Sequence, residues 1–154
     1  MKPRFGSKLR EGAAAILLGQ DGRLLMQLRD DVPHIRDPGM ISLFGGRREA
    51  DESFLDCIVR EIHEEIGYYL PPARFERIGR WFGPDYAVPG GTFHGEIFLA
   101  RAVPVERLTI TEGRLKIVAI DELEQLGNSL ALLAQYALEI YMKRELSSGL
   151  QLQP

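Results

Sequence analysis

The chain has 154 residues, of which 45% are hydrophobic and 27% charged, with a formal net charge of −3 and one cysteine. This length suits a single domain over residues 1–154, and the composition is that of an ordinary soluble globular protein. The slightly acidic balance argues against a dedicated nucleic-acid-binding protein, which is usually basic. The single cysteine excludes an intrachain disulfide.

No apolar run reaches the about 18 residues that a membrane-spanning helix needs. The basic opening MKPRFGSKLR is not followed by a signal-type apolar segment with a cleavage site. We therefore expect a cytoplasmic protein without a membrane partner, in a compartment that keeps its thiol reduced. Residues 1–8 and 147–154 are expected to be flexible tails.

In the first third of the chain, short apolar runs alternate with turn residues. Residues 19–22 tolerate positive φ and separate the first two runs, which predicts a hairpin. Residues 30–39 contain two prolines and three aspartates without periodicity, so they predict a loop. The predicted strands of this part are Gly12–Leu18, Arg23–Arg29 and Met40–Phe44.

Two later segments, residues 51–66 and 128–146, have apolar side chains at helical spacing. Asp121 is expected to cap a short helical turn before the second of these helices. Strands combined with one central and one C-terminal helix indicate an α/β fold, in which a mixed sheet lies between helices as an α/β/α sandwich. The predicted strands between the two helices are Arg74–Gly83, Thr92–Val103 and Leu115–Ile120.

The helix predicted over Asp51–Ile66 has its apolar side chains in one stripe and three glutamates beside that stripe. Glu61, Glu64 and Glu65 stand at i, i+3 and i+4, so their carboxylates are neighbours on the helix surface. Cys57 is expected on the side away from the stripe, as an inert small residue. The stripe consists of Leu55, Ile58, Val59, Ile62 and Ile66.

Three like charges this close repel one another, at a cost of roughly a few tenths of a kcal/mol for each i,i+4 pair. A hard divalent cation such as Mg²⁺ would compensate, because it binds oxygen ligands and favours carboxylates, waters and substrate phosphates. A solvated acidic face is the alternative for an isolated ExxEE pattern. The residues that flank the glutamates decide between the two interpretations.

These flanking residues extend the pattern over Gly46–Tyr68. It reads G-x5-E-x7-R-E-U-x-E-E-x-G-U, where U is a bulky aliphatic residue, and it closely resembles the Nudix box. Tyr68 stands where an aliphatic residue is usual, and Phe44 stands where family members often have proline before the paired glycines. The resemblance implies the Nudix fold and favours metal binding over a solvated acidic face.

The resemblance also implies roles for individual residues. Glu61, Glu64 and Glu65 match the family's metal ligands, with the Gly46 carbonyl as a further ligand. Glu61 is in addition the family's frequent candidate for orienting or deprotonating the attacking water. The implied cofactor is Mg²⁺, with Mn²⁺ as the alternative. The implied reaction is metal-dependent hydrolysis of the diphosphate bond in a nucleoside diphosphate linked to another group.

Two further features complete the predicted catalytic part. Glu52 and Arg60 are about two helical turns apart, and a bent entry into the helix would bring them together as an ion pair that orients the loop. A base from outside the box is common in the family, and Glu96 and Glu112 are the open alternatives here. The predicted catalytic residues are Glu61, Glu64, Arg60 and Glu112.

Cationic and aromatic side chains near the paired glycines are candidates for binding the substrate. Arginine suits forked contacts with phosphate, and a solvated loop arginine is the alternative. An aromatic cluster of Trp81, Phe82 and Tyr86 could sandwich a base, but packing of Trp81 and Phe82 against the sheet is slightly favoured. The predicted substrate-binding residues are Arg29, Arg47, Arg48 and Tyr86.

The nucleotide derivative itself stays open. A proline or a tyrosine downstream of the box marks different Nudix subfamilies, and here Pro84 and Tyr86 both lie in that zone. The expected partner is a small molecule (a nucleoside triphosphate, nucleotide sugar, ADP-ribose or dinucleoside polyphosphate) and no nucleic acid. Dimers are frequent in the family, so a homodimer is an open alternative.

Two other functions are alternatives to hydrolysis. A non-catalytic nucleotide-sensing regulator on the Nudix fold is the main alternative, although such proteins usually lose box glutamates and this chain keeps them. An isomerase acting on an isoprenoid diphosphate would need a catalytic cysteine, for which Cys57 is poorly placed within the helix.

Overall fold

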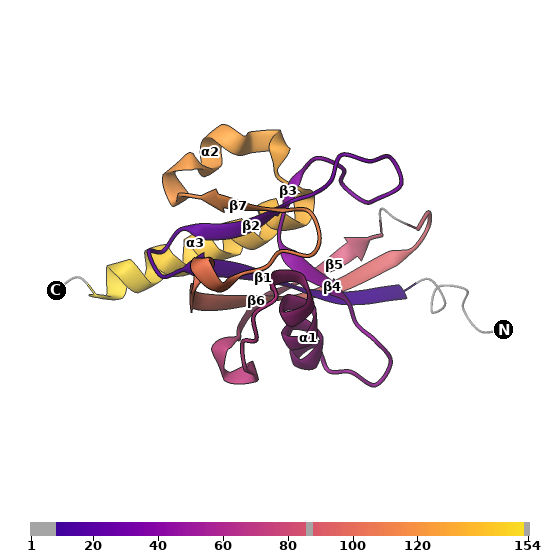
Figure 1. The fold of residues 1–154 in the computed structure, drawn as a ribbon, viewed down its shortest axis with the longest axis horizontal. Helices are drawn as coiled ribbons and strands as arrows, with labels where there is room; N and C mark the ends of the chain where they lie inside the picture. Colours follow the sequence, from indigo (N-terminus) through magenta and orange to yellow (C-terminus); the bar gives the residue numbers. More distant parts are fainter. Residues whose placement is uncertain (1–8, 86–87, 153–154) are drawn as a thin grey trace.

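The computed structural model of the protein describes residues 9–85 and 88–152. These residues form one seven-stranded sheet with helices on both faces (Figure 1). The predicted α/β/α sandwich is thereby confirmed. The strands are β1 (Leu9–Gly19), β2 (Leu24–Leu28), β3 (Ile41–Ser42), β4 (Phe44–Arg47), β5 (Glu76–Pro84), β6 (Thr92–Val103) and β7 (Arg114–Val118). The α-helices are α1 (Phe54–Ile66), α2 (Leu123–Leu126) and α3 (Leu132–Leu152), joined to the strands by loops and short 3₁₀ turns.

The sheet is mixed, and β1 lies at its centre. β1 runs parallel to β6 along one edge, and antiparallel to β2 and β4 along the other. β5 pairs with the far edge of β6, and β2 pairs also with β3 and β7. The strand with the paired glycines, β4, therefore shares an edge of β1 with β2.

Two apolar cores lie on opposite faces of this sheet. Alternate side chains of β1 enter them, so that Ala15 and Leu17 pack under α1 while Ile16 and Leu18 pack under α3. β6 is covered on both faces in the same way, with Ile97 and Leu99 in the core under α3 and Phe98 and Ala100 in the core under α1. In Figure 1, α1 lies on one side of the strands, and α2 and α3 lie on the other.

The predicted strands are all present, and all except the one over Thr92–Val103 have shifted ends. β6 has the predicted bounds, and the predicted hairpin is formed by β1 and β2, with Leu17 opposite Leu25. The strand predicted over Met40–Phe44 is instead divided between β3 and β4. β4 runs through the paired glycines because Gly45 and Gly46 pair with β1.

The first helix begins later than predicted. α1 starts at Phe54 and not at Asp51, because Ser53 is its N-cap and Asp51 has a left-handed backbone with φ 68°. The Ser53 hydroxyl accepts a hydrogen bond from the Asp56 N–H at 3.0 Å, which satisfies a free donor of the first turn. The helix ends as predicted at Gly67, whose φ of 64° is the left-handed conformation that glycine adopts most easily.

The last helix differs from the prediction at both ends. Asn128 does not open it, because Leu130 is extended and the Ala131 N–H donates to the Ile41 carbonyl at 2.9 Å. α3 then continues to Leu152, beyond the predicted end at residue 146. The expected cap at Asp121 is also wrong, since this residue lies inside the 3₁₀ turn Ile120–Glu122. Among the described residues, no helix has the length and apolarity that crossing a membrane requires.

Candidate active site

The buried face of α1 differs from the predicted stripe. Its centre at Ile58 and Ile62 is as predicted, but the buried arc extends toward Cys57 and Glu65. The prediction that Cys57 lies away from the stripe is therefore wrong, and its thiol is fully buried against the sheet. Glu65 is buried for the same reason, because it stands two turns after Ile58 on that side of the helix.

Glu65 is the most buried of the three glutamates predicted to bind metal, with 4% exposure. Its Oε1 accepts a hydrogen bond from the Gly45 N–H at 3.1 Å, and its Oε2 accepts one from Nε2 of Gln27 at 3.3 Å. Burial, with the nearby charges of Glu112 and Glu61, raises the pKa of the Glu65 carboxyl to about 8, although the hydrogen bond from the Gly45 N–H lowers it. The position therefore favours a positive partner, either a proton or a metal cation.

Glu61 lies directly over the backbone of Gly46. A Cβ on Gly46 would stand 2.2 Å from Cδ of Glu61, a separation that no real contact allows. The glycine is thus required by the close approach of a carboxylate, and not by its backbone angles. Oε1 of Glu61 accepts a hydrogen bond from Nη1 of Arg60 at 2.8 Å. The Glu61 carboxylate is therefore held between the Arg60 guanidinium and the Gly46 backbone.

Arg60 makes the ion pair that the sequence predicts. Its Nε and Nη2 donate to the two carboxylate oxygens of Glu52 at 2.7 and 2.9 Å, and Nη2 also donates to the Arg47 carbonyl at 3.0 Å. The hydrogen bonds from Arg60 lower the pKa of Glu52 to about 2. Arg60 thereby fastens the loop before α1 to the helix and holds Glu61 at the same time.

Glu64 lies on the outer side of the helix. Its side chain is 58% exposed, and its carboxylate lies 3.5 Å from Nη1 of Arg60. The structure therefore brings Glu61 and Glu65 together at β4 but leaves Glu64 in solvent. The roles of all three as metal ligands stay predictions.

The donor set at this point fits a hard divalent cation. Within residues 9–85 and 88–152, no three His, Cys, Asp or Glu side chains converge closely enough to hold an ion by themselves. Mg²⁺ does not require three, because it binds one or two carboxylates and completes its shell with water and substrate phosphates. Glu61 and Glu65 supply such carboxylates, and the missing Cβ of Gly46 leaves the space that Glu61 occupies.

The Gly46 carbonyl, predicted as a further ligand, lies toward the interior. It accepts a weak hydrogen bond from the Cys57 thiol at 3.6 Å, and a Cβ on Gly12 would stand 2.6 Å from it. Burial raises the pKa of the Cys57 thiol to about 12, so this cysteine is inert at neutral pH.

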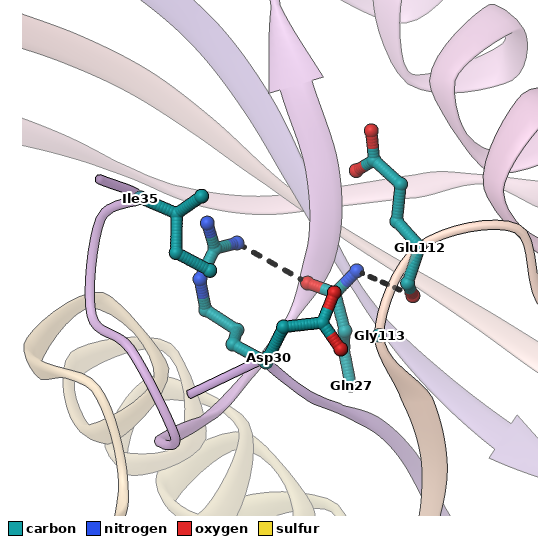
Figure 2. A pocket seen from close by; sticks show the side chains of 6 residues that line it. Gln27, Asp30, Ile35, Glu112 and Gly113 are labelled. Atoms are coloured by element: carbon teal, nitrogen blue, oxygen red, sulfur yellow. Dashed lines mark hydrogen bonds between the residues drawn. The ribbon is translucent and has the colours of Figure 1, made fainter. Parts of the chain in front are cut away.

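Two cavities lie near the paired glycines and Gln27, and both are lined by Arg29. The larger, of about 320 Å³, is lined by Arg29 and Arg47 together with the paired glycines and Phe93. The smaller, of about 220 Å³, is lined by Gln27, Arg29 and Glu112, and is shown in Figure 2. Arg29 and Arg47 thus line a cavity with the paired glycines, and Glu112 lines the other cavity; their roles stay predictions.

The other predicted substrate residues are placed differently. Arg48 donates to Glu11 Oε1 and to the Glu52 carbonyl, each at 2.6 Å, so its guanidinium is already engaged within the protein. Tyr86 lies outside the described residues. Trp81 packs edge-on against Tyr136 of α3, with ring centroids 5.1 Å apart, whereas Phe82 is 69% exposed and does not pack the sheet as favoured.

The two open candidates for an outside base differ in their partners. Glu96 is 6% exposed, and its Oε2 accepts a hydrogen bond from Nε of Arg77 at 2.7 Å, so its charge is compensated within the sheet. Glu112 has an exposed side chain at the edge of the smaller cavity, close enough to affect the titration of Glu65. The structure thus favours Glu112.

One buried polar residue of the site escaped the sequence analysis. Gln27 is 2% exposed in β2 and donates to Glu65. The available signal was a single amide among apolar residues in the run RLLMQLR. Its partner is 38 positions away, so no local pattern connects the two.

Comparisons with known proteins agree with this arrangement. A model of the NUDIX domain matches residues 8–139. A protein of Stutzerimonas stutzeri (strain A1501), described as NAD-capped RNA hydrolase NudC, is 31% identical over 109 residues. These residues are 71% of this chain but only 37% of that relative, so the similarity covers a minor part of the relative's length.

Solved structures show the same fold. The MutT NUDIX hydrolase from Burkholderia pseudomallei is 27% identical with a TM-score of 0.65, over 85% of this chain and 96% of that one. The MutT protein from Methanosarcina mazei Go1 has a TM-score of 0.72 over 88% of this chain and 95% of that one. Its identity is 16%, so it supports the fold alone.

Proposed function

The chain belongs to the Nudix family, whose domain model matches most of its length, and on that premise we propose that it is a hydrolase of nucleotide diphosphate derivatives. The bond cleaved is the diphosphate bond of a nucleoside diphosphate linked to another group. The proposed cofactor is Mg²⁺, with Mn²⁺ as a substitute. The substrate is a nucleoside triphosphate, a nucleotide sugar, ADP-ribose or a dinucleoside polyphosphate.

The observation that carries this proposal is the meeting of two carboxylates at a strand glycine. Glu65 is buried with one protein donor on each oxygen, and Glu61 fills the space that the missing Cβ of Gly46 leaves. Two anionic groups in such a place are stable only with a positive partner. Glu61 has such a partner in the Arg60 guanidinium at 2.8 Å, whereas the donors that contact Glu65 among the described residues are neutral amides, so Glu65 lacks a protein cation beside it.

The residues of the chain then have distinct tasks. Glu61 and Glu65 would hold the cation, and Arg60 keeps Glu61 oriented by its bond at 2.8 Å. When bound, the cation would supply charge neutralisation of the diphosphate and activation of a water molecule. Glu112, exposed beside Glu65, is our candidate for accepting the proton of that water, with Glu61 as the alternative.

Arg29 and Arg47 are proposed to bind the phosphates. Both line the larger cavity next to the paired glycines, and Arg29 also reaches the smaller cavity beside Glu112. A guanidinium presents a planar set of donors that matches phosphate oxygens, so two of them can orient the diphosphate across the box. The two cavities that Arg29 lines offer room for the nucleoside and for the linked group.

A substrate screen tests the proposal. The protein is incubated with Mg²⁺ or Mn²⁺ and each candidate class, and the products are identified by mass. NAD-capped RNA is included because the Stutzerimonas relative is described as its hydrolase. We expect a nucleotide product from at least one class and none after chelation. Binding without product across all classes would contradict hydrolysis and favour a nucleotide-sensing regulator.

Glu65→Gln is the matched variant for this screen. The amide has the size of the carboxyl but removes a negative ligand, so we expect turnover to fall by about two orders of magnitude or more. Stability should be retained, because a neutral group suits the buried position. If instead thermal stability collapses while activity per folded molecule persists, the metal role of Glu65 is wrong.

A further inference from the structure

β2 carries a polar side chain at a position where its neighbours belong to the core. Gln27 is 2% exposed, and it faces the same side of the sheet as Leu25, a residue of the core under α1. Burying an amide without hydrogen bonds costs roughly 1–3 kcal/mol. An amide at this position therefore depends on partners within the protein.

Gln27 has three such partners from three parts of the chain. Its Nε2 donates to Oε2 of Glu65 at 3.3 Å and to the carbonyl of Glu112 at 3.1 Å. Its Oε1 accepts from Nη1 of Arg29 at 3.3 Å. In Figure 2 the bond to Glu112 ends on the backbone carbonyl, while the Glu112 carboxylate points away from the amide.

The chemistry of the partners fixes the orientation of the amide. The Glu112 carbonyl can only accept, and so can the Glu65 carboxyl when it is ionised. The Arg29 guanidinium can only donate. A flipped amide would place its oxygen against two acceptors and its NH₂ against a donor. Gln27 therefore has one stable orientation, and both its N–H bonds and its oxygen are used.

This amide also completes the hold on Glu65. The Gly45 N–H binds Oε1 at 3.1 Å and Gln27 binds Oε2, so each carboxylate oxygen has a donor from a different strand. Two donors on the two oxygens set the plane of the carboxylate. Partners of this kind orient a metal-binding carboxylate, and their loss typically costs 10- to 100-fold in metal affinity, by order of magnitude.

We propose that Gln27 is the positioning residue of this site. It orients Glu65, holds the loop that carries Glu112, and ties both to Arg29, which lines both cavities. One amide thus sets the relative positions of a cation-binding group, a candidate base and a phosphate-binding group. This inference rests on the proposed function, because the roles of its three partners are taken from it.

The test measures Mn²⁺ binding to the substrate-free protein by calorimetry, and compares the wild type with Gln27→Met. Methionine has nearly the volume of glutamine but no amide. We expect the Kd for Mn²⁺ to rise about tenfold or more, with Tm retained because an apolar side chain suits the core. In a crystal structure of the variant, the Glu65 carboxylate should leave the Gly45 N–H and residues 111–113 should shift.

Met26→Leu is the matched control. Met26 adjoins Gln27 in β2 and is equally buried, but it faces the core under α3. Its replacement should leave the Kd for Mn²⁺ unchanged. Where Gln27→Met does not fold, Gln27→Leu replaces it, because leucine also lacks the amide and suits the apolar surroundings of β2. We expect the same weakening of Mn²⁺ binding from this variant.

Unchanged Mn²⁺ affinity in folded Gln27→Met, with Glu65 and residues 111–113 in place in its crystal structure, would overturn the inference. A wild-type protein that does not bind Mn²⁺ at all would overturn the proposed function instead. The crystal structure would then still decide whether Gln27 positions Glu65, since that readout does not depend on a metal.

Discussion

At the scale of single residues, the site depends on a few charges whose surroundings differ sharply. Glu52 and Glu65 are both box glutamates, yet the pKa of the first is lowered to about 2 and that of the second is raised to about 8. The difference follows from their partners, since Glu52 faces the Arg60 guanidinium whereas Glu65 is buried among neutral donors. Glu52 therefore acts as a structural anion, and Glu65 is available for a cation.

The Glu52–Arg60 pair leads to a prediction about stability in acid. Because the pKa of Glu52 is lowered from 4.5 in the unfolded chain to about 2 in the folded protein, its stabilising effect is complete above pH 4.5. It is lost as the pH falls through about 2. We expect Glu52→Gln to remove about 2 kcal/mol of this dependence, measured as the free energy of unfolding in urea between pH 5 and pH 2, an order-of-magnitude figure.

Glu49→Gln is the control for this measurement. Glu49 also approaches Arg60, at 3.7 Å, but its side chain is 70% exposed. A surface pair of this kind contributes little, so its replacement should leave the acid dependence unchanged. Equal behaviour of the two variants would mean that the Glu52 pair does not stabilise the loop before α1.

At the scale of elements, the site is formed where β4 presses against α1 on one side and β1 on the other. The two adjacent glycines of β4 serve these two contacts separately. A Cβ on Gly46 would meet the end of the Glu61 side chain, whereas a Cβ on Gly45 would lie 2.2 Å from the Ala13 carbonyl oxygen. A side chain can move away and a strand backbone cannot.

Replacing each glycine by alanine should therefore separate activity from stability. We expect Gly46→Ala to fold with a Tm near that of the wild type but to lose about tenfold or more in turnover, because Glu61 is displaced. Gly45→Ala should instead lower Tm strongly, since Gly45 also has a φ of 155°. Thermal melts and kcat for both variants check this, and a fully active Gly46→Ala would contradict the position of Glu61.

At the scale of the whole molecule, the site joins elements that are far apart in sequence. Glu65 of α1 is linked by hydrogen bonds to Gly45 of β4 and to Gln27 of β2, and Gln27 is linked to the loop before β7. A ligand bound at this point holds two strands, a helix and a loop together. Its binding free energy is then added to the stability of the fold.

We therefore expect Mn²⁺ or Mg²⁺ with a non-hydrolysable nucleotide diphosphate analogue to raise Tm by several degrees. At 100 times Kd the gain in unfolding free energy is about 2.7 kcal/mol, which corresponds to roughly 8 °C for a domain of this size. Differential scanning calorimetry with and without a chelator measures it. The shift should vanish in Glu61→Gln, and a shift that survives in this variant would place the ligand elsewhere.

The sequence by itself determined much of this protein. The spacing of apolar residues gives the strands and the two main helices, and the box gives Glu52–Arg60, the end of α1 at Gly67 and the family. These features are local or periodic, so they are visible in one stretch of sequence. The rotation of α1 about its axis, which buries Cys57 and Glu65 and exposes Glu64, could not be predicted from the sequence. The apolar stripe of a helix is a broad arc, so it determines only approximately which side chains face the core.

Only the tertiary structure decided which side chains meet. The engagement of Arg48 with Glu11, the compensation of Glu96 by Arg77 and the link from Gln27 to Glu65 all join residues from different strands and helices. Such contacts depend on strand order and register, which bring distant segments side by side. The local sequence pattern of each segment does not show which other segment it will contact. The choice of charge partners, and hence which glutamate is free for a cation, is set by packing.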